Sequence, residues 1–182
     1  MTIGTLIGSG RVADVYAWGE DQVIKLFRNG TSVSQVEQEA AIGRALYQAG
    51  LPVPATGQII KADGHYGIIF ERVKGPSMLA EMSTKPWKII QYARLMAELH
   101  VAMHDVIISG LPLPSQREHL QQRLRQSDVL SANHKETILY ILDRLPDSNR
   151  LTHGDFHPDN IVMTPDGPVI IDWATARQGN PL

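Results

Sequence analysis

The stretch of sequence that decides the fold is His153-Gly154-Asp155-Phe156-His157-Pro158-Asp159-Asn160, followed by Val169-Ile170-Ile171-Asp172-Trp173. A short hairpin is predicted between Asn160 and Asp172, about the turn Asp166-Gly167. Phosphoryl transfer needs one carboxylate to receive the proton of an attacking hydroxyl. It also needs a second carboxylate and an amide oxygen as ligands for Mg²⁺ at the phosphates. Each of these residues alone is better explained as a turn or cap residue, but Asp155, Asn160 and Asp172 together favour kinase chemistry.

Two histidines of this stretch, His153 and His157, lie four residues apart and suggest a metal site. Zinc sites favour histidines on a helix or paired with cysteine. Gly154 and Pro158 argue against a helix, and the chain has no cysteine. We interpret His153 as a structural hydrogen-bonding residue and leave His157 without an assigned role.

A glycine-rich segment lies near the N-terminus, in Gly8-Ser9-Gly10-Arg11-Val12-Ala13-Asp14-Val15. Small residues at 8, 10 and 13 would let backbone amides approach phosphates, and Val15 would cover an adenine ring. An ordinary hairpin turn explains the glycines equally well without a ligand. A dinucleotide-binding turn needs a helix after the glycines, whereas residues 12–16 have the pattern of a strand.

Lys25 is unusual because it lies within the apolar segment Val23-Ile24-Lys25-Leu26-Phe27. Burying an ammonium group is unfavourable unless it is paired. The amphipathic helix predicted over residues 33–49 offers Glu39 as the preferred partner and Glu37 as the alternative. In kinases such a pair orients the α- and β-phosphates of the nucleotide. The competing explanation is an edge lysine that points to solvent.

An apolar strand, Ile68-Ile69-Phe70, runs into a polar connector at residues 71–75. This is the pattern of a hinge that binds adenine through backbone groups, here those of Glu71 and Val73. The end of an ordinary strand explains the pattern equally well.

The order of the predicted elements indicates an α+β fold with two lobes. The first lobe, residues 1–73, is a nucleotide-binding sheet with one helix, and its strands are predicted at 3–7, 12–18, 22–27, 58–62 and 66–72. The second lobe, residues 74–182, is mainly helical. Its core-facing stripe is predicted to be Ile89, Tyr92, Met96, Leu99, Met103 and Val106. Further helices are predicted near 115–127 and 131–145, and the hairpin at 161–164 and 169–172.

The composition is that of an ordinary globular protein, with 43% hydrophobic and 20% charged residues and a net charge of −2 over 182 residues. Nothing resembles the basic footprint of a nucleic-acid-binding protein. We see neither a signal-peptide pattern nor an apolar stretch long enough to span a bilayer. We therefore expect a cytoplasmic protein that binds neither nucleic acid nor membrane. The sequence gives no indication of the oligomeric state.

In this order the four segments resemble the aminoglycoside phosphotransferase and choline kinase family, a branch of the protein-kinase-like fold. The resemblance runs from about Ile3 to the last residue, and Gly154 points to this branch because protein kinases usually carry arginine there. It implies ATP and Mg²⁺ as cofactors and the hydroxyl of a small molecule as acceptor. It implies these site residues: the base Asp155, the magnesium ligands Asn160 and Asp172, the ion pair Lys25 and Glu39, and the phosphate loop from Gly8 to Ala13.

The sequence departs from the family pattern in three places. Ala13 stands where a third glycine often occurs, and Ala174 where some members carry a further acid. Family members usually continue beyond the position of Leu182 with helices that build part of the acceptor pocket. Two hypotheses therefore stay open: a small-molecule kinase, which the retained polar residues favour, and an ATP-binding module or truncated pseudokinase that acts through partner binding.

Overall fold

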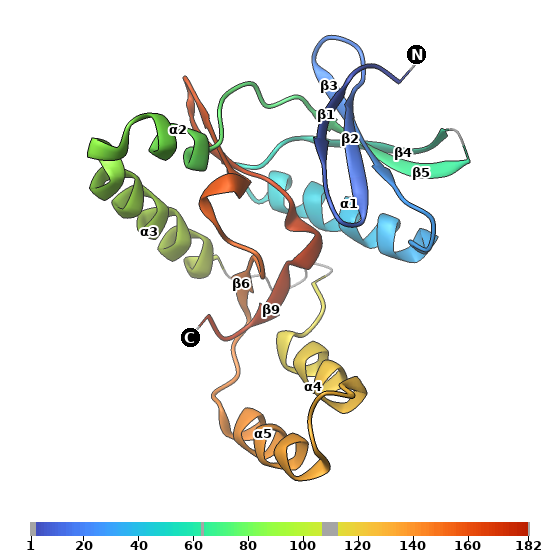
Figure 1. Ribbon diagram of the computed structural model, residues 1–182, viewed down its shortest axis with the longest axis vertical. Helices are drawn as coiled ribbons and strands as arrows, with labels where there is room; N and C mark the ends of the chain where they lie inside the picture. The colour runs from blue at the N-terminus through green and yellow to red at the C-terminus, as the bar shows by residue number, and fades with distance from the viewer. Residues whose placement is uncertain (1–2, 63, 107–112, 182) are drawn as a thin grey trace. The chain divides into compact units, whose positions relative to one another are not determined.

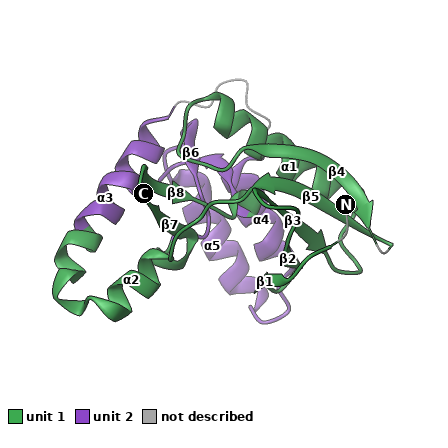
Figure 2. Cartoon of the chain, turned by 90° about the horizontal axis from the view of Figure 1, so that it is seen from above, with its two compact units in different colours: residues 1–93, 157–174 green, residues 94–156, 175–182 purple. Residues whose placement is uncertain are grey.

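The computed structural model describes residues 3–62, 64–106 and 113–181 (Figure 1). The chain forms two compact units, coloured separately in Figure 2. The first unit comprises residues 1–93 and 157–174, and the second comprises residues 94–156 and 175–182. The lobe boundary between residues 73 and 74 stays a prediction. Asp63, which we expect in the turn between the last two strands of the first lobe, and Pro112, which we expect to break the chain after the core-facing helix, lie outside the described residues.

A five-stranded antiparallel sheet organises the first unit, with the strand order β1-β2-β3-β5-β4 (Figure 1). The strands are β1 (Leu6–Ser9), β2 (Ala13–Ala17), β3 (Gln22–Phe27), β4 (Thr56–Ala62) and β5 (His65–Glu71). The five strands expected in this region are confirmed, with ends shifted by at most three residues. The sheet and the helices that accompany it confirm the α+β class.

The register of β2 with β3 decides which side chains share a face. Ala13 pairs with Phe27, Asp14 with Leu26 and Val15 with Lys25. Neighbouring residues along a strand point to opposite faces. Ala13, Val15, Lys25 and Phe27 therefore lie on one face of the sheet, and Asp14 lies on the other.

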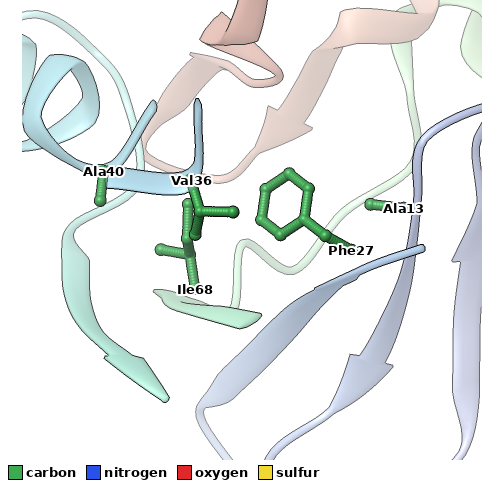
Figure 3. Packing of buried hydrophobic residues seen from close by; sticks show 5 residues of the cluster. All are labelled: Ala13, Phe27, Val36, Ala40 and Ile68. Atoms are coloured by element: carbon green, nitrogen blue, oxygen red, sulfur yellow. The ribbon is translucent and has the colours of Figure 1, made fainter. Parts of the chain in front are cut away.

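Helix α1 (Val33–Gln48) packs on the face that carries Lys25. Its N-terminus has a capping box, in which the Ser32 hydroxyl accepts a hydrogen bond from the Gln35 N–H and the Gln35 side chain accepts one from the Ser32 N–H. The chain leaves the helix through Gly50, whose φ of 80° is the left-handed conformation that favours glycine. The core between helix and sheet, shown in Figure 3, consists of Ala13, Phe27, Val36, Ala40 and Ile68.

The rest of the first unit places a hairpin against the connector that follows β5. Its elements are α2 (Met78–Thr84), the 3₁₀ helices η1 (Pro86–Lys88) and η2 (Pro158–Asn160), and the strands β7 (Ile161–Thr164) and β8 (Gly167–Ile170). The Met163 N–H donates to the Pro76 carbonyl at 2.9 Å. A Cβ on Gly75 would overlap the carbonyl oxygen of Met163, so the connector lies directly against β7.

The second unit contains most of α3 (Ile89–Asp105), together with α4 (Gln116–Gln126), α5 (Ala132–Arg144), β6 (Arg150–Thr152) and β9 (Arg177–Gly179). Helices α4 and α5 contact each other, and β6 pairs with β9. The prediction that one side of α3 faces the core is confirmed at Tyr92 and Met103, which are buried. It is wrong at Ile89, which is exposed because it is the first residue of the helix. In the described parts of the chain, every helix is too short or too polar to cross a membrane.

Candidate active site

Lys25 joins two acids from distant parts of the sequence. Its Nζ lies 2.8 Å from Oε1 of Glu39 on α1 and 2.7 Å from Oδ1 of Asp172, which follows β8. The side chains of Lys25 and Glu39 are 13% and 9% exposed, whereas that of Asp172 is 46% exposed. We call these three residues the inner cluster. Of the two glutamates considered from the sequence, Glu39 contacts Lys25.

Burial and charge act in opposite directions on the inner cluster. Desolvation by burial lowers the pKa of Lys25, but the charges of Glu39 and Asp172 outweigh it, so the pKa of the amine is raised. Burial raises the pKa of the Glu39 carboxyl, and Lys25 offsets this in part. The lysine is therefore firmly protonated at neutral pH, and the charge of Glu39 depends on Lys25.

Asp172 has a left-handed backbone conformation, with φ of 61°. The sequence predicted a strand up to Asp172, but β8 ends at Ile170, so that prediction is wrong by two residues. The buried Trp173 anchors this turn by donating from its Nε1–H to the Ile170 carbonyl at 3.0 Å. Left-handed conformations are unfavourable for residues other than glycine and concentrate at functional sites.

Asn160 is buried at the start of the same hairpin. The Ile171 N–H donates to its backbone carbonyl at 3.0 Å, which ties Asn160 to the neighbour of Asp172 in the sequence. His157, which had no role assigned from the sequence, contacts two residues of this turn. Its Nδ1 accepts from the Asp159 N–H at 3.3 Å, and its Nε2 lies 3.1 Å from the side-chain nitrogen of Asn160. His157 thus caps η2 and contacts the amide of the residue proposed to bind magnesium.

The glycine-rich segment lies on the first two strands. Gly8 pairs with Val15, so both face the side of the sheet that carries Lys25. A Cβ on Gly8 would meet no atom within 4 Å, so packing within the described residues does not require glycine there. Gly10 has a different role, because its N–H donates to the Ala13 carbonyl at 2.9 Å and closes the turn. The missing side chain of Gly8 leaves open space on the Lys25 side of the loop.

The connector proposed as a hinge is tied to the segment before β4. The Glu71 N–H donates to the Ala55 carbonyl at 2.9 Å, and the Glu71 carboxylate accepts from the Ala55 N–H at 3.1 Å. These contacts fix the end of β5. The assignment of Glu71 and Val73 to adenine binding stays a prediction.

Asp155 lies in the second unit, exposed on the loop after β6. Its N–H donates to Nδ1 of the buried His153 at 3.3 Å, as expected for a structural histidine. Gly154 has φ of 81°, and a Cβ there would lie 2.6 Å from the Thr175 carbonyl oxygen. The Thr175 hydroxyl in turn donates to the His153 carbonyl at 2.9 Å. Glycine is therefore required at 154, and the loop that carries Asp155 is held on both sides.

A second ion-pair cluster, formed by Ser9, Asp14 and Arg28, was not predicted from the sequence, and we call it the outer cluster. Arg28 contacts both Asp14 and Ser9 through its guanidinium group. One clue was available, because the alternation within β2 places Asp14 on the face opposite Lys25. No pattern in the sequence indicated that Arg28, beyond the end of β3, reaches back to it.

Comparison with known proteins agrees with this geometry. The family model described as the phosphotransferase enzyme family matches residues 3–182. The ADP-bound aminoglycoside phosphotransferase APH(2'')-Ib is 19% identical with a TM-score of 0.67, over 100% of this chain and 69% of that one. The aminoglycoside-3'-phosphotransferase of type VIII is 20% identical with a TM-score of 0.67, over 99% and 73%. The gentamicin complex of APH(2")-IIa is 18% identical with a TM-score of 0.69, over 97% and 66%.

No curated protein matches the chain. It spans 66% to 73% of the three solved structures above. At 18% to 20% identity these structures establish the fold, and the family match covers nearly all of the chain. The chain belongs to the phosphotransferase enzyme family and has the protein-kinase-like fold of aminoglycoside phosphotransferases.

Proposed function

We propose that the chain binds Mg·ATP on the face of the sheet that carries Lys25 and transfers the γ-phosphoryl group to a hydroxyl of a small molecule. The inner cluster carries this proposal. A purely structural lysine would be satisfied by the buried Glu39 alone. The second acid, Asp172, is 147 residues away in the sequence, half-exposed and in a left-handed conformation, and packing gives no reason for these features.

Each residue of the inner cluster then has a role in nucleotide binding. Lys25 donates hydrogen bonds to the α- and β-phosphates, and Glu39 fixes the direction of the ammonium group. The open space at Gly8 lets backbone amides of the loop approach the phosphates.

The oxygen donors of Asp172 and Asn160 fit magnesium. Mg²⁺ prefers hard oxygen ligands and usually takes one or two from the protein, with phosphates and water supplying the rest. Bound magnesium would neutralise charge on the β- and γ-phosphates.

Asp155 is the proposed base. Its carboxylate would orient the acceptor hydroxyl and receive its proton as the oxygen attacks the γ-phosphorus. His153 and Gly154 hold the loop so that this carboxylate faces solvent. One solved structure of the same fold, 16% identical with a TM-score of 0.61, is a streptomycin–ATP ternary complex of APH(2")-IIa. For this chain we propose a hydroxyl-bearing small molecule, to be sought among amino alcohols, sugars and aminoglycosides.

The test is Asp155→Asn, which keeps the shape of the side chain and removes the charge that accepts the proton. Positioned proton transfer contributes about 10²- to 10⁴-fold to a rate. We expect turnover with the best acceptor of the panel to fall by an amount in that range, with Mg·ATP affinity within about twofold of wild type.

Two results would count against this assignment. If no acceptor stimulates ATP consumption by the wild type, the chain is an ATP-binding module. If Asp155→Asn abolishes ATP binding, Asp155 has a structural or metal-binding role and is not the base.

A further inference from the structure

We propose that Arg28 is a positioning residue for the glycine loop: through Asp14 and Ser9 it holds residues 8–13 in the conformation that receives phosphates. This inference rests on the proposed function, since it assigns the loop to phosphate binding. It concerns the outer cluster, in which Asp14 and Arg28 bind no ligand in the proposed function and Ser9 belongs to the predicted phosphate loop.

The outer cluster is a closed set of hydrogen bonds. The Arg28 guanidinium is bidentate on Asp14, at 2.7 Å from Nη2 to Oδ1 and 3.3 Å from Nε to Oδ2. Nη2 also donates to the Ser9 hydroxyl at 3.0 Å, and that hydroxyl donates to Asp14 Oδ1 at 2.6 Å. Ser9 ends β1 and Asp14 lies on β2, so one side chain from beyond β3 clamps both sides of the loop.

The backbone of Arg28 adds a further contact to the same loop. Its N–H donates to the Val12 carbonyl at 2.9 Å. Between β1 and β2 the turn has its own hydrogen bond from Gly10 to Ala13, and Val12 is exposed. β1 is also an edge strand of the sheet. A short exposed turn on an edge strand has little stability of its own, so contacts from outside it decide its order.

The cluster lies on the side of the sheet where it cannot obstruct a ligand. Ser9 pairs with Asp14, and both point to the face opposite Val15 and Lys25. The inner side of the loop, where Gly8 leaves open space, therefore stays free. Hydrogen bonds from Arg28 and Ser9 lower the pKa of the Asp14 carboxyl, so the clamp is charged at neutral pH.

We expect loss of the Arg28 contacts to lower the affinity only for ligands that carry phosphates. Ordering a loop in advance removes part of the entropy cost of binding. An exposed ion pair with good geometry accounts for a factor of about three to five in an equilibrium constant. Loss of the clamp should therefore weaken ATP binding by about that factor and leave adenosine binding unchanged, because adenosine has no phosphate for the loop to bind.

The experiment measures dissociation constants of Mg·ATP and adenosine by calorimetry for wild type, Arg28→Gln, Arg28→Lys, Asp14→Asn and the double variant. We expect Arg28→Gln to weaken ATP about threefold to fivefold, Arg28→Lys to weaken it less, and the double variant to match Arg28→Gln. Lys85→Gln is the matched control, because Lys85 forms an ion pair with Glu81 of α2 in the same unit, outside both the loop and the connector. Hydrogen exchange of residues 8–13 should accelerate in Arg28→Gln and stay unchanged in the control.

Each contrary result has a separate meaning. Equal weakening of ATP and adenosine would show a general role of Arg28 in folding and overturn the proposal. Additive losses in the double variant would indicate that Arg28 contacts phosphate directly, and would overturn it too. If the wild type binds no ATP, the proposed function fails, and hydrogen exchange still decides whether Arg28 holds the loop.

Discussion

The inner and outer clusters lie on opposite faces of the same sheet, and they differ in burial far more than in geometry. Lys25 lies 2.8 Å from Glu39, and Arg28 lies 2.7 Å from Asp14. The first two side chains are 13% and 9% exposed, the second two 49% and 23%. Contact distance therefore does not rank the two pairs. Their exposure to water does separate them. An exposed ion pair contributes little to stability, whereas a buried charge that loses its partner destabilises the fold strongly.

The largest expected effect comes from Lys25→Met. The variant leaves Glu39 buried without its cation, and breaking a buried pair costs about 3 kcal/mol at the lower end of the usual range. Arg28→Met is the matched control, because it introduces the same side chain at an exposed cation. Urea unfolding at pH 7 should show a large loss of stability for Lys25→Met and a much smaller one for Arg28→Met. Equal losses would mean that burial does not separate the clusters.

The pH dependence of Lys25→Met sharpens the same comparison. Burial raises the pKa of Glu39, and without Lys25 it rises further. The folded chain then keeps a proton that the unfolded chain releases above about pH 4.3. The protonated Glu39 therefore makes its full contribution to the stability of the variant below that pH. This contribution is lost as the pH rises through the pKa that Glu39 has in the folded variant.

Unfolding curves between pH 5 and pH 8 measure this effect. The stability gap between wild type and Lys25→Met should widen as pH rises. Adding Glu39→Gln to the variant should remove the pH-dependent part. A gap that is constant with pH would contradict an ionised, buried Glu39.

The fold was largely predictable because turn residues separate its strand segments and because serines cap the starts of α1, α2, α4 and α5. Helix α1 runs from Val33 to Gln48, within one residue of the range predicted from the sequence. The β6–β9 pair was not predicted. Each of its strands has three residues, too few for a period to appear, and the partners lie 25 or more residues apart along the chain.

The candidate site was predicted by motif, and its details were not. The contact of Lys25 with Glu39 was predicted because a lysine within an apolar strand needs a partner of opposite charge. The left-handed turn at Asp172 could not be predicted, because residues 169–172 have the sequence pattern of a continuous strand. The outer cluster was not predicted, because Arg28 lies beyond the end of β3. The alternation of side chains along a strand therefore does not indicate where its side chain lies.

A smaller effect separates the structural and chemical roles of Asp172, the exposed member of the inner cluster. Asp172→Gly and Asp172→Ala both remove the carboxylate, so both should abolish the magnesium dependence of ATP affinity. They differ in the backbone, since glycine adopts φ of 61° freely and alanine pays about 1 kcal/mol.

Thermal unfolding of the two variants measures this difference. The glycine variant should be the more stable by about that amount. Equal stabilities would show that the left-handed turn is not kept when the carboxylate is absent. Retained magnesium dependence in either variant would remove Asp172 from the metal site.

The smallest expected effect is the response of the two clusters to salt. The screening length falls from about 10 Å at 0.1 M to about 3 Å at 1 M ionic strength, and exposed pairs are screened more than buried ones. The difference in melting temperature between wild type and Asp14→Asn should therefore shrink as sodium chloride is raised to 1 M. The difference between wild type and Lys25→Met should persist, because water and ions reach Lys25 and Glu39 poorly. Comparing these differences cancels the general effect of salt on hydrophobic burial, which is common to all three proteins. If both differences shrank together, the inner cluster would be open to solvent, and burial could not be the reason that the two clusters differ.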